Sequence, residues 1–194
     1  MRRRDLLASV ATATTMAAAG CNSLGESLAR DDGGDAGPVT GETESVARDA
    51  GPVTVETLDA PGSEAGRTTV PEPGRVTFVE FFATTCGVCA SQMSVVGEAH
   101  ERVDDDVQFL SVTSEPVGLT VSADDVAAWW ADHGGTWPVA TDDGTELARA
   151  YDATSVPTAV VVAPDGTETW SHAGPTTAAT IADEIRAARG GESA

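Results

Sequence analysis

Lysine is absent from this chain of 194 residues: all 11 of its basic residues are arginine, against 31 aspartates and glutamates. The net charge of −20 excludes nucleic acid as an expected partner, because the chain would be repelled by a phosphate backbone. Long apolar runs are missing as well. The weakly apolar stretch from Leu6 to Ala19 is short and rich in threonine, so we expect no permanent membrane span. Cysteine is scarce, and two further ligands at a spacing suited to structural zinc are lacking.

The hydrophobic content of 41% is that of a globular protein, and the length suits one domain with appendages. An acidic composition without lysine is typical of extreme halophiles, such as halophilic archaea. In molar salt the Debye length shrinks to about 3 Å, which screens the self-repulsion of such a chain. An acidic protein that works at low salt is the alternative.

The N-terminus predicts a targeting segment over residues 1–20. The run Arg3-Arg4-Asp5-Leu6-Leu7 resembles the twin-arginine export signal, and Ala18-Ala19-Gly20-Cys21 resembles the lipobox of lipoproteins. Chance matches are the alternative to each. Together they predict an exported protein, lipidated on Cys21 and anchored to the outer face of the cell membrane.

Residues 21–50 carry almost no large apolar side chains, so we interpret them as a disordered acidic tether. The segment DAGPVTGET at 35–43 recurs as DAGPVTVET at 49–57, which we interpret as a local duplication that lengthened the tether. The folded domain is predicted over residues 51–194.

Within this domain, apolar periodicity and turn residues predict strands that alternate with helices, and therefore a three-layer α/β sandwich. The tryptophans of the middle segment, Trp129, Trp130 and Trp137, are interpreted as packing residues, and Asp104–Asp106 as a solvated loop. Strands are expected at 53–57, 68–70, 76–82, 107–113, 137–140, 158–162 and 167–172, and helices at 86–103, 123–133, 145–151 and 176–189.

The pair Cys86 and Cys89 follows the apolar run VTFVEFFATT, at an expected turn from strand to helix. The N-terminus of a helix presents unpaired N–H groups and a partial positive charge, which lower the pKa of a thiol placed there and stabilise its anion. Three residues apart, the two cysteines share a helical face and can form a disulfide. A static disulfide that braces the helix start is the alternative to a reactive pair.

FVEFFATTCGVC resembles the active-site strand and turn of the thioredoxin superfamily, and YDATSVPTAVVV resembles its second signature, a cis-proline before a central strand. The segment from Glu115 to Ala140 resembles the extra helix and strand of the membrane-anchored TlpA/ResA-like thiol-disulfide oxidoreductases. The resemblance implies a thioredoxin-like three-layer α/β/α sandwich with a central mixed sheet, an N-terminal β-hairpin and an inserted helix-strand unit.

The resemblance also implies roles for individual residues. Cys86 would attack a disulfide of the substrate and Cys89 would resolve the mixed disulfide. Glu80 would be the buried acid that exchanges a proton with Cys89, with a pKa raised towards neutrality; a glutamate facing solvent is the alternative. Pro157, if cis rather than trans, would place the backbone of Val156 beside the cysteines, where it can pair with substrate.

Two positions depart from the family pattern. Thr85 stands where most relatives carry tryptophan, so the aromatic lip over the site is missing, and Val88 replaces the proline of thioredoxin. Neither histidine nor lysine lies between the cysteines to stabilise a thiolate, which favours a reductant over a strong oxidant.

We therefore predict a membrane-anchored thiol-disulfide oxidoreductase that acts on protein disulfides, including apocytochrome c or other exported thiols, with electrons from a membrane partner. We expect a monomer with no organic cofactor and no metal. One alternative is a copper chaperone with Cys86, Cys89 and a histidine such as His172 as ligands. A peroxidase is disfavoured because Val79 and Ala83 occupy the proline and threonine positions of its P-x-x-x-T-x-x-C motif.

Overall fold

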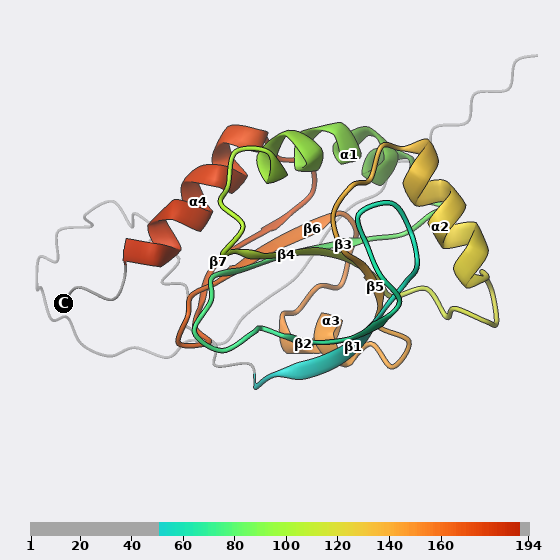
Figure 1. The fold of residues 1–194 in the computed structure, drawn as a ribbon, viewed down its shortest axis with the longest axis horizontal. Helices are drawn as coiled ribbons and strands as arrows, with labels where there is room; N and C mark the ends of the chain where they lie inside the picture. Colours follow the sequence, from blue (N-terminus) through green and yellow to red (C-terminus); the bar gives the residue numbers. More distant parts are fainter. Residues whose placement is uncertain (1–50, 191–194) are drawn as a thin grey trace, which may run out of the picture. The chain divides into compact units, whose positions relative to one another are not determined.

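The computed structural model describes residues 51–190 (Figure 1). The predicted export signal, Cys21 and the tether lie outside these residues. No helix in the described range is long and apolar enough to cross a membrane. The elements, in chain order, are β1 (Val53–Thr57), β2 (Gly66–Val70), β3 (Thr77–Phe82), α1 (Gly87–His100), β4 (Gln108–Thr113), α2 (Ala123–Asp132), β5 (Val139–Thr141), α3 (Glu146–Ala150), β6 (Thr158–Val162), β7 (Glu168–Ala173) and α4 (Ala178–Gly190).

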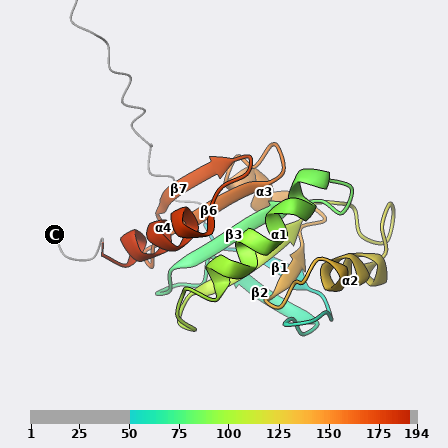
Figure 2. The same ribbon diagram turned by 90° about the horizontal axis from the view of Figure 1, so that it is seen from above.

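The strands form one mixed seven-stranded sheet in the order β2-β1-β5-β4-β3-β6-β7. β3 lies parallel to β4 and antiparallel to β6, and β1 and β2 form the predicted N-terminal hairpin. α1, α2 and α4 cover one face of the sheet and α3 covers the other (Figures 1 and 2). The three-layer sandwich with its hairpin and inserted helix-strand unit is therefore confirmed.

All six residues of β3 are buried, because this strand lies inside the sheet and is covered on both faces. Successive side chains alternate between the faces. Phe78 and Phe82 pack in the cluster under α1, whereas Val79 and Phe81 pack in the cluster on the α3 face. Glu80 has the same parity as Phe78 and Phe82, so it points towards the α1 face.

α1 begins directly after Cys86 but ends at His100, three residues before the predicted Val103. The acidic run Asp104–Asp106 follows, and negative charge is unfavourable at the C-terminus of a helix. This run is not simply solvated. Arg189 from the last turn of α4 pairs with Asp104 at 2.8 Å and with Asp106, and Arg75 donates to the carbonyl oxygens of Asp105 and Asp106 at 2.9 and 2.8 Å.

The inserted unit packs through its tryptophans. Ser122 caps α2 in a capping box with Asp125. Trp130 and Trp137 are buried and meet edge to face, with ring centroids 4.7 Å apart. The strand predicted from Trp137 starts two residues later, at Val139, after Pro138, which has no N–H to donate to the ladder.

Trp129 is half-buried and stacks on Phe82, with ring centroids 5.1 Å apart. The interpretation of all three tryptophans as packing residues agrees with these contacts.

Candidate active site

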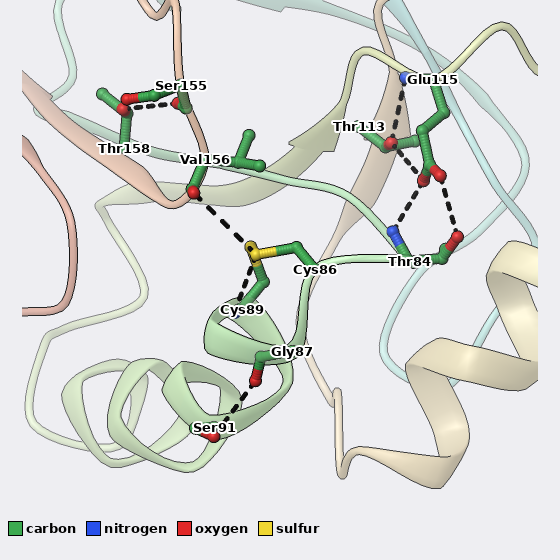
Figure 3. Close-up of a disulfide and its surroundings, with 10 residues drawn as sticks. All are labelled: Thr84, Cys86, Gly87, Cys89, Ser91, Thr113, Glu115, Ser155, Val156 and Thr158. Atoms are coloured by element: carbon green, nitrogen blue, oxygen red, sulfur yellow. Dashed lines mark hydrogen bonds between the residues drawn. A yellow bond between two sulfur atoms is a disulfide. The ribbon is translucent and has the colours of Figure 1, made fainter. Parts of the chain in front are cut away.

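Cys86 and Cys89 form a disulfide at the N-terminus of α1, with 5.2 Å between their Cα atoms (Figure 3). Cys86 is the N-cap residue, and its Sγ accepts a hydrogen bond of 3.0 Å from the backbone N–H of Cys89. Cys86 is half-buried, whereas Cys89 is 1% exposed. An incoming disulfide can therefore reach Cys86 but not Cys89.

The surroundings of Cys86 favour its thiolate once the disulfide is reduced. A sulfur at the N-cap position faces the free N–H groups of the first helical turn, which lower the pKa of a thiol. The two residues between the cysteines carry no charge, and Val88 is 49% exposed. The stabilisation of the thiolate thus comes from the backbone of α1 rather than from a charged side chain.

Val156 and Pro157 form one wall of the site. The bond between them is cis, as the resemblance implied. The carbonyl oxygen of Val156 lies 3.9 Å from Sγ of Cys86, and its side chain is 38% exposed. The N–H of Gly174 donates to the carbonyl oxygen of Pro157 at 2.8 Å, which ties this wall to the connection between β7 and α4. An extended peptide can therefore lie along Val156 with its sulfur against Cys86.

Thr85 is exposed beside Cys86 and adds no aromatic surface. Its neighbour Thr84, which the sequence reasoning did not single out, is held firmly. Both the N–H and the hydroxyl of Thr84 donate to the carboxylate of Glu115, at 2.7 and 2.9 Å. Glu115 was missed as well. The available signal was its position two residues after the strand predicted at 107–113, matching Thr84 two residues after the strand at 76–82.

Glu80 is 2% exposed, so the alternative of a glutamate facing solvent is wrong. Loss of hydration raises the pKa of Glu80 to about 8, and the hydrogen bond from Ser111 opposes this only in part. The hydroxyl of Ser111 donates to Glu80 over 3.4 Å and accepts the indole N–H of Trp137 at 3.0 Å. Since Trp137 occupies the oxygen of Ser111 as an acceptor, the hydroxyl proton is directed to Glu80.

The described part of the chain offers no obvious metal centre. No group of three or more His, Cys, Asp or Glu side chains in residues 51–190 is arranged to hold an ion. His172, named above as a possible copper ligand, stacks on Trp170 and contacts the carbonyl oxygen of Pro175 at 3.2 Å.

A family model described as Redoxin matches residues 48–185. StoA from Bacillus subtilis is 20% identical with a TM-score of 0.57, over 70% of this chain and 98% of its own. The pneumococcal exposed lipoprotein thioredoxin from Streptococcus pneumoniae is 19% identical with a TM-score of 0.59, over 71% of this chain and 99% of its own. A protein described as thiol:disulfide interchange protein DsbE, from Chlorobium tepidum, is 19% identical with a TM-score of 0.56, over 73% of this chain and 96% of its own. No curated protein matches the sequence.

The structural likenesses establish a thioredoxin-like fold, and the family model covers well over half of the chain. The disulfide-forming pair lies at the start of the first helix after the central strand β3. The chain therefore belongs to the Redoxin family, and it is an oxidoreductase.

Proposed function

We propose that this protein is a membrane-anchored thiol-disulfide oxidoreductase that reduces disulfides of exported proteins. The observation that carries the proposal is the disulfide between a half-buried Cys86 at the helix N-cap and a buried Cys89, beside the carbonyl of Val156. This arrangement gives one accessible sulfur, one protected sulfur and a backbone edge for an extended substrate.

In the reduced protein, the thiolate of Cys86 attacks one sulfur of the substrate disulfide. A bond forms between Cys86 and that sulfur, the substrate disulfide breaks, and the other substrate sulfur leaves as a thiolate that takes a proton. The helix N-terminus and the N–H of Cys89 stabilise the attacking anion. The carbonyl of Val156 lines the path of the incoming chain.

Resolution needs the buried Cys89 as a thiolate. When Glu80 is ionised it accepts the proton of the Cys89 thiol, and Cys89 then attacks Sγ of Cys86. The mixed disulfide breaks, the substrate leaves with two thiols, and Cys86–Cys89 closes again. With a pKa of about 8, only about a tenth of Glu80 is ionised at pH 7, so this step speeds up as the pH rises. Each cycle transfers two electrons to the substrate, and a dithiol donor must restore them.

The proposed direction, as a reductant, is supported by what surrounds the thiolate. Strong oxidants of this fold have a stabilised reduced form. Here Gly87 and Val88 contribute no charge, and Thr85 adds no aromatic cover. With only the helix N-terminus to stabilise the thiolate, we propose that the disulfide is the favoured form and that the reduced protein acts as the electron donor.

The sequence supports a location outside the cytoplasm. Residues 1–20 resemble a twin-arginine signal that ends in a lipobox at Cys21, and one structural neighbour is, by its name, an exposed lipoprotein. Lipid on Cys21 leaves Cys86 and Cys89 as the free thiols. A membrane partner would supply electrons, and apocytochrome c or other exported thiols would be the substrates. The acidic, lysine-free composition supports a halophilic source.

The test uses the full chain, purified in detergent and molar salt and reduced with dithiothreitol. The reduced protein should reduce the disulfide of a model protein with two electrons per chain and without added metal or organic cofactor. Cys86→Ser should abolish the reaction. Tight stoichiometric copper binding without disulfide reduction would contradict the proposal and favour a copper chaperone.

A further inference from the structure

The turn that carries Cys86 has little apolar packing of its own. Thr85 and Gly87 are exposed, and Ala83, Thr84 and Cys86 are half-buried. Inside the turn, the N–H of Cys86 donates to the carbonyl oxygen of Ala83 at 3.1 Å. Thr85, directly before Cys86, carries no ring that could pack over the turn, and the turn has polar contacts with a neighbouring segment.

Glu115 supplies those contacts from the loop that follows β4 (Figure 3). One carboxylate oxygen accepts the N–H of Thr84 at 2.7 Å, and the other accepts the hydroxyl of Thr84 at 2.9 Å. The hydroxyl of Thr113 donates to the same carboxylate at 3.1 Å and accepts the N–H of Glu115 at 3.2 Å. The carboxylate therefore joins the turn before Cys86 to the end of β4.

The sheet explains why these residues meet. β3 and β4 run parallel, with Phe82 opposite Thr113 at the last position of each strand. Thr84 and Glu115 each lie two residues beyond this pair, so both follow the C-terminal ends of neighbouring parallel strands and come close together. The loop of Glu115 is itself anchored, because the N–H of Val117 donates to the carboxylate of Asp143 at 3.3 Å.

We propose that Glu115 is a positioning residue that holds the Cys86 turn against the end of β4, so that the sulfur of Cys86 stays over the N-terminus of α1. The proposal rests on the proposed function insofar as Cys86 is the attacking sulfur. Hydrogen bonds to a charged acceptor are stronger than neutral ones, and two of them end on one residue of the turn. Without them the turn moves, and the sulfur loses part of its contact with the N–H of Cys89.

Glu115 affects the pKa of Cys86 in two opposite ways: it holds the turn in position, and it carries a negative charge. A carboxylate near a thiol raises the pKa of the thiol, so removing the charge of Glu115 alone would make Cys86 ionise at a lower pH. Loss of position would make Cys86 ionise at a higher pH, because the helix N-terminus stabilises the thiolate less. The other titratable groups around Cys86 are Cys89 on α1 and Glu80 on β3. The facing segments 154–157 and 174–177 carry none.

The experiment compares Glu115→Ala and Glu115→Gln with the wild-type protein. Each full chain is reduced, and alkylation of Cys86 by iodoacetamide is followed by peptide mass spectrometry from pH 4 to pH 10 in molar salt. Gln can still accept the N–H of Thr84 but carries no charge. Thr84→Val removes only the hydroxyl contact, and Glu184→Ala on α4 is the control carboxylate. Circular dichroism establishes that each variant is folded.

We expect Glu115→Ala to move the alkylation midpoint to higher pH and to slow alkylation below the midpoint about tenfold, as befits the loss of a hydrogen bond to a charged group. Thr84→Val should shift the midpoint in the same direction by less. Glu115→Gln should restore the wild-type rate within about threefold, and Glu184→Ala should change nothing. A folded Glu115→Ala protein whose midpoint stays or falls would overturn the inference, and so would a Gln variant as slow as the Ala variant. Because alkylation needs no disulfide substrate, failure here is distinguishable from failure of the proposed function.

Discussion

Replacement of Glu80 by glutamine should change how the stability of the oxidised protein depends on pH. Burial raises the pKa of Glu80 from 4.5 to about 8. Between these two values the folded protein keeps a proton that the unfolded chain has released, so stability falls as the pH rises. The contribution of the neutral carboxyl is fully present below the unfolded pKa and is lost as the pH rises through the folded pKa.

The size of the effect follows from the width of this window. A shift of one pKa unit corresponds to about 1.4 kcal/mol. The wild-type protein therefore loses about 5 kcal/mol of unfolding free energy in total, of which about 4 kcal/mol is lost between pH 5 and pH 9. Glu80→Gln removes the titration and keeps the size of the side chain. The free energy of unfolding of the variant should therefore exceed that of the wild type by a margin that grows by about 4 kcal/mol over this range.

Urea unfolding of the oxidised proteins, at constant molar salt from pH 5 to pH 9, measures this margin. In the oxidised state Cys86 and Cys89 do not titrate, and groups common to both proteins cancel in the difference. Glu98→Gln on the exposed side of α1 is the matched control, and its margin should stay within about 1 kcal/mol throughout. If the difference in the free energy of unfolding between Glu80→Gln and the wild type does not change with pH, the folded protein does not hold Glu80 in its protonated form.

Three further outcomes are expected. Ser111→Ala removes the hydrogen bond that lowers the pKa of Glu80, so the loss of stability should extend to higher pH in the same urea experiment. Gly135→Ala would place a Cβ 2.2 Å from the ring of buried Trp130 and should lower the free energy of unfolding by about 1–3 kcal/mol, whereas Gly190→Ala, with nothing within 4 Å of its Cβ, should be nearly neutral. Dilution from molar to millimolar salt should lower the melting temperature because the charge of −20 is then unscreened; an unchanged melting temperature would count against adaptation to high salt.

Much of the fold could be predicted because the residues that decide it are local. β3 shows in the sequence as a nearly continuous apolar run, and Ser122 with Asp125 marks the start of α2. The predicted bounds of strands are wrong where the local apolar pattern alone does not decide which residues join the sheet. The sequence predicts that Trp137 begins β5, but Pro138 interrupts the ladder and the strand starts at Val139, while the ring of Trp137 packs against Gly97 and Trp130.

The site shows the same division. Cys86, Cys89, Glu80 and the Val156–Pro157 wall sit in recognisable motifs, so their placement could be predicted from short segments. The hydrogen bond between Thr84 and Glu115 could not be predicted in this way, because it depends on the register of β3 against β4. A single sequence does not encode that register in any one stretch. The burial of Glu80 beside the neutral Ser111 also depends on which residue of β4 faces it.

The central claim is that Cys86 attacks and Cys89 resolves. Incubation of reduced Cys89→Ser and Cys86→Ser proteins with a protein disulfide, followed by acid quenching and mass spectrometry, tests it most directly. We predict a stable mixed disulfide on Cys86 in the Cys89→Ser protein and little adduct on the buried Cys89 in the Cys86→Ser protein. Equal adducts at equal rates on both cysteines would contradict the assignment of roles.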